Sequence, residues 1–319
     1  MTIINMFQDK FIGDHAKPTI DKITMVAPSP NTIYKNSITA GGTVDYEKLS
    51  LDAAFTASLD KTLAKSTKSS AYKFSAMIYL DGLVHGFLLQ MGPKNNNGKN
   101  PFIRMEFNPN KLGPDGMTQI AACLVNFIDT GFEHLWEHGK TTRIDIAVDL
   151  HGVKVGQVRF LNNWGTTERI IGTDGQIETI YVGKSTSSQT KIYNKAKEAK
   201  LPPDVVITRV ERSIRTQVPL KNLSKLLNKF EHLALADVLP AKPDTVETYL
   251  WELFSDSVEK RGPASALNLL PKELRKVIVA HLKATACDFW NPAEIWSHWP
   301  AAVQPILDAV GPVPSAKAA

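Results

Sequence analysis

Cysteine and long apolar stretches are scarce in this sequence. The 319 residues include two cysteines, Cys123 and Cys287, which are too few for a disulfide framework or for a zinc site built from cysteines. No apolar run approaches the ~20 residues of a transmembrane helix, and the first residues lack the basic and apolar segments of a secretory signal. These absences predict an intracellular protein of a reducing cytoplasm, with no membrane segment.

A disorder-promoting composition is also absent. Apolar residues make up 43% of the chain and charged residues 22%, and these ordinary values exclude disordered and fibrous proteins. At about 100–200 residues per domain, the length predicts two domains. A chain of this size buries enough surface to fold without disulfide bonds.

Positive charge, in contrast, is concentrated in one part of the chain. The formal net charge is +5, but residues 141–230 contain 15 Lys and Arg against 8 Asp and Glu. Within residues 181–230 the two numbers are 11 and 3, whereas the chain outside 141–230 has 22 and 24. A local positive field of this kind is typical of nucleic-acid binding, although a solvated basic face would have the same composition.

The hydrophobic periodicity divides the chain into two regions. Alternation predicts strands, and helical spacing predicts helices, in the part before residue 220: strands at 75–89, 102–107, 142–150, 177–183 and 207–215, and helices at 116–138 and 192–200. After residue 220 only helices are predicted, at 221–235, 245–260 and 272–285. We therefore predict an α+β fold, with an antiparallel-sheet domain in residues 1–220 and a helical region in residues 221–319.

The segment 179–198, TIYVGKSTSSQTKIYNKAKE, combines a tyrosine with a Gly-Lys-Ser turn and several lysines. Tyr193 lies where a strand is expected to become a short helix, with Lys191, Lys195 and Lys197 around it. Ammonium groups can hold a phosphate and favour the phenolate form of a tyrosine, whose free pKa is about 10. The pattern allows attack by the phenol on a phosphodiester, and it also allows a tyrosine that only packs at a strand end.

Carboxylates on the polar faces of the predicted strands are a second group of candidates. Asp145 and Asp149 share one face of strand 142–150, and Glu211 lies on strand 207–215. Acidic groups on strands of one sheet can converge on Mg²⁺ or Mn²⁺, which prefer oxygen ligands. The same residues could instead form salt bridges with arginines of their own strands.

Three blocks of this region resemble the motifs of rolling-circle replication initiators, in order and in spacing. They are RIDIAVD (143–149), the tyrosine segment (179–198) and TRVERSIR (208–215). The resemblance includes the filamentous-phage gene II type and the plasmid replication initiation factor group. IDKITMVAP (20–28) and RMEFNPNKLG (104–113) also resemble the phage type.

The resemblance implies a nicking endonuclease that cuts one strand of an origin, stays linked to the 5′ phosphate through a tyrosine, and later rejoins the strand. It implies Tyr193 as the nucleophile with Lys195 beside it, and Mg²⁺ or Mn²⁺ held by Asp145, Asp149 and Glu211. The eight histidines contain no His–apolar–His metal motif, which favours a carboxylate site. We further expect the DNA backbone to contact Lys184, Ser185, Lys191, Lys197, Arg209 and Arg215.

The partners implied by the resemblance are origin DNA, a host helicase and a single-strand-binding protein, in the cytoplasm of a bacterial host. A homodimer is one assembly that it allows. The helical region 221–319 is a candidate for origin binding or oligomerisation, with 272–284 as the segment for origin recognition. Residues 231–319 are slightly acidic, however, with 8 Lys and Arg against 11 Asp and Glu. A relaxase that starts conjugative transfer would use the same tyrosine chemistry, and a non-catalytic DNA-binding regulator could share the scaffold.

Two other motifs indicate different chemistry. His134 and His138 form an H-x-x-E-H pattern, as in inverted zinc peptidases, at the predicted end of helix 116–138. Histidines near a helix C-terminus also have a structural explanation, because the helix dipole favours them. Gly183-Lys184-Ser185 matches the end of a phosphate-binding loop, but residue 178 is a glutamate where that motif requires a glycine, so a nucleotide-hydrolysing motor is not predicted.

Overall fold

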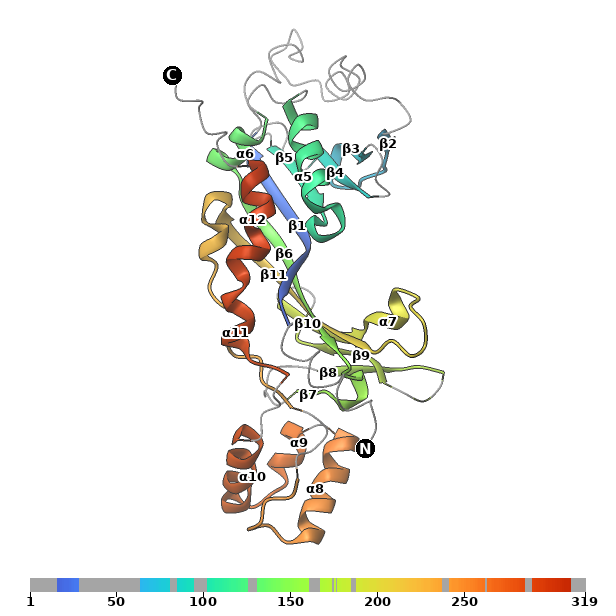
Figure 1. Ribbon diagram of the computed structural model, residues 1–319, viewed down its shortest axis with the longest axis vertical. Helices are drawn as coiled ribbons and strands as arrows, with labels where there is room; N and C mark the ends of the chain where they lie inside the picture. The colour runs from blue at the N-terminus through green and yellow to red at the C-terminus, as the bar shows by residue number, and fades with distance from the viewer. Residues whose placement is uncertain are drawn as a thin grey trace, which may run out of the picture. The chain divides into compact units, whose positions relative to one another are not determined.

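The computed structural model describes residues 16–28, 64–80, 85–94, 102–125, 131–160, 167–173, 175, 177–184, 188–236, 241–261, 263–284 and 289–310. Strands dominate up to residue 219 and helices dominate after residue 247 (Figure 1). The predicted α+β class is confirmed. Within these described residues, no helix has the length and apolar character that crossing a membrane would require.

The first half of the chain contains six strands and two helices within its described ranges. They are β1 (Pro18–Pro28), β2 (Ala64–Ser66), β3 (Tyr72–Tyr79), β4 (Gly86–Pro93), β5 (Phe102–Phe107), α5 (Pro109–Val125), α6 (Phe132–His138) and β6 (Lys140–His151).

The remaining strands and helices follow β6. They are η2 (Val155–Gln157), β7 (Arg159–Phe160), β8 (Thr167–Ile171), β9 (Ile177–Val182), β10 (Ser188–Asn194), α7 (Lys195–Glu198), β11 (Ile207–Pro219), η3 (Leu220–Lys225), β12 (Leu235–Ala236), α8 (Thr248–Arg261), α9 (Pro263–Asn268), α10 (Lys272–Ala284), α11 (Pro292–Ser297) and α12 (Trp299–Val310).

Among the described strands, ten form one sheet in the order β2-β3-β4-β5-β1-β6-β11-β10-β9-β8, and β12 pairs with β7 in a second, two-stranded sheet. The strand pairs whose register is described are all antiparallel. Strand β6 matches the predicted strand 142–150. Its residues from Ile144 to Val148 are all buried, so the strand is central and Asp145 is not on a solvent face as the alternation suggested.

The chain separates into two compact units. The Tyr193 unit comprises Met1–Pro18, Ala147–Ser213 and Leu227–Trp299, and the Glu106 unit comprises Thr19–Ile146, Ile214–Leu226 and Pro300–Ala319. Strands β6 and β11 contribute residues to both units. Each unit is therefore assembled from segments that are distant in the sequence.

Several predicted elements differ from the structure. The predicted strand 75–89 is two strands, β3 and β4, which pair antiparallel with Tyr79 opposite Gly86. The predicted helix 116–138 is α5 and α6 as far as it is described. Helix α5 begins earlier, at Pro109, and bends at Gly113 (φ 63°), directly before Pro114.

The predicted helix 221–235 is the 3₁₀ helix η3 followed by irregular chain, with a strand at its end. Its apolar residues Phe230 and Leu233 are buried, and the Trp290 side chain packs on Phe230 and donates its indole N–H to the Leu233 carbonyl at 2.7 Å. Tertiary contacts of this kind hold the segment without a regular helix. Helices α8 and α10, in contrast, match the predicted ranges closely.

Candidate active site

Tyr193 is the next-to-last residue of β10, directly before α7. It pairs with Thr179 of β9, and Lys191 pairs with Tyr181 in the same ladder. The side chains of Lys191 and Tyr193 lie on one face of the sheet, because residues two apart on a strand point the same way. The predicted short helix at 192–200 is therefore shorter than expected, and the tyrosine is held by a strand.

Asn194 ends the strand and starts the helix. Its side-chain oxygen accepts a hydrogen bond from the Lys197 backbone N–H at 2.9 Å, which caps α7. The cap fixes the point where the chain leaves the sheet, one residue after the tyrosine. Asn194 was not among the predicted site residues, although an asparagine before a Lys-Ala-Lys-Glu helix is a recognisable cap signal.

Glu211 of the neighbouring strand β11 connects the tyrosine to a lysine. The Tyr193 hydroxyl donates to Glu211 Oε2 at 3.2 Å, and Lys191 Nζ donates to Glu211 Oε1 at 3.0 Å. The Glu211 side chain is only 8% exposed, whereas that of Lys191 is 30% exposed. The buried Glu211 carboxylate thus accepts one hydrogen bond from a lysine and one from the Tyr193 hydroxyl. This places a proton acceptor within reach of the tyrosine.

Asp149 and Arg209 form a second pair in the same unit. Arg209 donates from Nε and Nη2 to the two Asp149 oxygens, both at 2.7 Å, which is the bidentate geometry of a strong ion pair. The Arg209 side chain is 5% exposed. In this arrangement its guanidinium binds a carboxylate of the protein, and Lys191 likewise binds Glu211.

Asp145 belongs to the Glu106 unit, where it is buried. Arg143 of the same strand donates to its two oxygens, each at 2.9 Å. Each of the three predicted metal ligands, Asp145, Asp149 and Glu211, therefore binds a basic side chain. Within the described part of the chain, no three His, Cys, Asp or Glu residues are grouped so that they could hold a metal ion. This arrangement does not fit a three-carboxylate centre, and the Mg²⁺ or Mn²⁺ requirement stays a prediction.

The remaining basic candidates lie around the tyrosine or at the surface. Lys195 forms an ion pair with Glu198, and the exposed Lys197 forms one with Glu178. Lys184 and Arg215 are exposed, and Ser185 lies outside the described residues. The four lysines of segment 179–198 are thus all at least partly exposed.

Gly183 begins the connection between β9 and β10. Its φ of +85° is a left-handed conformation, and a side-chain carbon at this position would lie 2.8 Å from the Ser188 carbonyl oxygen. The glycine of the Gly-Lys-Ser sequence is therefore explained by its left-handed backbone and by its close approach to Ser188.

The H-x-x-E-H motif lies on α6. His134 Nε2 contacts the Pro28 carbonyl oxygen at 2.6 Å, and the His134 and His138 rings are 4.9 Å apart. The first histidine is thus engaged with the backbone of β1, which gives it a structural role.

A comparison with solved structures finds similarity to a replication protein. The chain is similar in structure to a rolling circle replication initiator protein from Geobacillus stearothermophilus, with a TM-score of 0.41 and 14% sequence identity. The similarity covers 76% of this chain and 97% of the other. No protein-family model and no curated protein matches the sequence.

Proposed function

We propose that the protein nicks and rejoins one strand of an origin through Tyr193, and so initiates rolling-circle replication of a phage or plasmid. The observation that carries the proposal is the hydrogen bond from the Tyr193 hydroxyl to the buried Glu211 carboxylate, at 3.2 Å. A phenol beside a proton acceptor is the arrangement that an activated nucleophile requires. The excess of basic residues in 181–230 supports a polyanionic substrate.

The chemistry follows from the positions of these groups. Glu211 accepts the phenolic proton, and the Tyr193 oxygen forms a bond to the phosphorus of the scissile phosphodiester while the bond from phosphorus to the 3′ oxygen breaks. The 3′ oxygen takes a proton from water and leaves as a hydroxyl, and the 5′ phosphate stays on the tyrosine. Attack by a 3′ hydroxyl on the phosphotyrosine reverses these steps and rejoins DNA without a nucleotide cofactor.

Lys191 has a defined part in this arrangement. Its ammonium group balances the charge of Glu211 before the reaction, and a bound phosphate would add a second negative charge nearby. Lys195, at the first position of α7, is placed two residues after the nucleophile. We propose that these two lysines hold the phosphate while it is transferred.

A covalent-adduct assay with supercoiled plasmid that carries the cognate origin tests the proposal. The wild-type protein should yield open circles with protein on the 5′ end, and Tyr193→Phe should lower the yield by about 10³-fold or more because it lacks the nucleophilic oxygen. Tyr181→Phe, on the neighbouring strand, is the matched control and should retain the adduct. Reactions with Mg²⁺, Mn²⁺ or EDTA test the predicted cofactor.

Two results would contradict the proposed function. If Tyr193→Phe formed open circles and adducts as well as the wild type, Tyr193 would not be the nucleophile. If the wild type bound DNA but never cut it, the protein would be a non-catalytic regulator. In the first case, mass spectrometry of the peptide that retains a nucleotide identifies the linked residue.

A further inference from the structure

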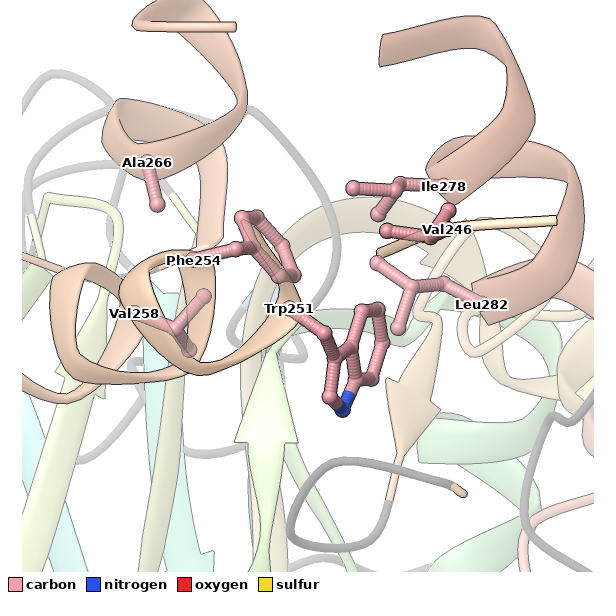
Figure 2. Close-up of a cluster of buried hydrophobic side chains, with 7 residues drawn as sticks. All are labelled: Val246, Trp251, Phe254, Val258, Ala266, Ile278 and Leu282. Atoms are coloured by element: carbon pink, nitrogen blue, oxygen red, sulfur yellow. The ribbon is translucent and has the colours of Figure 1, made fainter. Parts of the chain in front are cut away.

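Helices α8, α9 and α10 form a small module within the Tyr193 unit. All three contribute to one apolar cluster with Val246, and their side chains point toward one another (Figure 2). The cluster consists of Val246, Trp251, Phe254, Val258, Ala266, Ile278 and Leu282. The ring of His281 packs edge-on against Trp251, and its Nε2 contacts the Ala241 carbonyl oxygen at 2.7 Å, which fixes the end of α10.

The connection between α9 and α10 is a tight turn of three residues, Leu269 to Pro271. Arg275, in the first turns of α10, donates from Nη2 to the carbonyl oxygens of Asn268 at 3.2 Å and Leu270 at 3.1 Å. The guanidinium therefore ties α10 to the end of α9. A turn of three or four residues between two helices is one feature of a helix-turn-helix.

The exposed residues of α10 include two lysines, together with Glu273 and Val277. Lys272, Lys276 and Ala280 are exposed and lie four residues apart, so that they form one row along the helix. The whole helix has four basic residues and one acidic residue. Lys276 forms an ion pair with Glu273, but the two side chains are 62% and 79% exposed, so a phosphate could replace the glutamate at little cost.

The outward face of α8 has the opposite character. Glu252 and Asp256 are exposed there, together with Tyr249 and Leu253. An acidic surface repels a polyanion, so the two faces differ in the ligand that they can bind. The difference in exposed charge therefore favours a nucleic-acid contact at α10 over one at α8.

We infer that α8, α9 and α10 form a helix-turn-helix module whose second helix, α10, binds duplex DNA. In this geometry the N-terminal half of the second helix enters the major groove, and that half holds Lys272 and Lys276. The small side chain of Ala280 allows the wall of the DNA major groove to approach the helix. The inference shares DNA with the proposed function, but it concerns duplex that is bound, not the strand that is cut.

Duplex affinity at several salt concentrations tests this inference. The full chain with Tyr193→Phe binds without cutting, and a fluorescent mixed-sequence duplex is the probe. Lys272→Ala with Lys276→Ala should weaken binding about tenfold or more at 0.1 M salt and lower the slope of log affinity against log salt by about 2, since two phosphate contacts are lost. Lys272→Arg with Lys276→Arg should restore both quantities.

Two control pairs make the outcome specific. Lys111→Ala with Lys140→Ala removes the same charge from exposed sites of the Glu106 unit, and Tyr249→Ala with Leu253→Ala alters α8. Either control pair weakening binding as much as the α10 pair would overturn the inference, as would an unchanged salt slope for the α10 pair. Circular dichroism establishes that each variant is folded.

The nicking assay separates this inference from the proposed function. With Tyr193 intact, the α10 double variant should still form the covalent adduct on a single-stranded oligonucleotide that contains the cleavage site. An adduct that forms normally while duplex binding is lost supports both ideas. If no adduct forms with the wild type either, the proposed function fails, while duplex binding by the Tyr193→Phe chain still decides the role of α10.

Discussion

Each of the two units contains a glutamate that bonds to a lysine and to a hydroxyl group on neighbouring strands. In the Tyr193 unit, Glu211 bonds to Lys191 and to the Tyr193 hydroxyl. In the Glu106 unit, Glu106 bonds to Lys22 at 3.2 Å and accepts from the Thr24 hydroxyl at 3.1 Å. The two networks share their types of group but differ in how completely the carboxylate is neutralised.

Glu106 has a second cation. Arg104 donates to it at 2.6 Å and also to the Gln90 side-chain oxygen at 2.5 Å, while Gln90 donates to Ser75 at 3.0 Å. These pairs lie directly opposite each other, since Glu106 faces Thr24 and Arg104 faces Gln90 in the strand registers. Burial alone would raise the pKa of Glu106, but Lys22 and Arg104 together hold it below its ordinary value.

This comparison shows why a hydroxyl beside a carboxylate is not sufficient for a reactive site. Glu106 is bound by two cations, and its hydroxyl partner is an aliphatic threonine, which is a far weaker acid than a phenol. Glu211 is bound by one cation and by a phenol that can give up its proton. We therefore interpret the Glu106 network as structural and the Glu211 network as catalytic.

The largest expected difference between the networks is in catalysis. Glu211→Gln keeps the shape of the side chain but removes the proton acceptor, so nicking should fall by about 10²–10⁴-fold. Glu106→Gln should change the nicking rate less than about threefold, because this residue has no part in the proposed step. Initial rates of adduct formation on a single-stranded oligonucleotide measure both effects.

Equal losses of activity in the two glutamine variants would contradict the assignment of catalysis to the Glu211 network alone. The assignment would also be wrong if Glu106→Gln were the more defective of the two after correction for the folded fraction. Thermal unfolding of each variant supplies that correction.

Local patterns in the sequence predicted much of the fold. The alternation in 142–150 and the helical spacing in 245–260 and 272–285 correspond to β6, α8 and α10. The reversal between β3 and β4 was missed, although the buried apolar positions change from even to odd numbers and Asp81-Gly82 is a sequence signal for a hairpin. The register of Tyr79 opposite Gly86 depends on pairing that no local pattern records.

The candidate site was only partly predictable for the same reason. The sequence indicated Tyr193 from a lysine-rich segment and Glu211 from the polar face of a predicted strand. Their hydrogen bond depends on β10 lying next to β11 in the sheet. The bidentate pair of Arg209 with Asp149 spans 60 positions, so spacing alone could not distinguish a metal ligand from a salt-bridge partner.

The second expected difference is in stability. Lys191→Met leaves the Glu211 carboxylate, 8% exposed, without its cation. The free energy of unfolding should fall by about 2 kcal/mol, between the values for exposed and for fully buried pairs. Lys22→Met should cost less than about 1 kcal/mol, because Lys22 is 40% exposed and Arg104 still binds Glu106. Urea unfolding measures both, and an equal loss would contradict the difference in neutralisation.

The smallest expected effect is in the pH dependence of the Glu106 network. Because the pKa of Glu106 is lower in the folded protein than its ordinary value of 4.5, its ionised form stabilises the fold at pH values above that ordinary value. The contribution is lost as the pH falls through the lowered pKa. The melting temperature of Glu106→Gln should therefore lie below that of the wild type at neutral pH, and the difference should shrink as the pH falls below 4.5 and through the lowered pKa. A difference that stayed constant from neutral pH to an acidity at which the Glu106 carboxyl is protonated would mean that the cost of Glu106→Gln comes from lost packing, and that Lys22 and Arg104 do not stabilise the charged carboxylate.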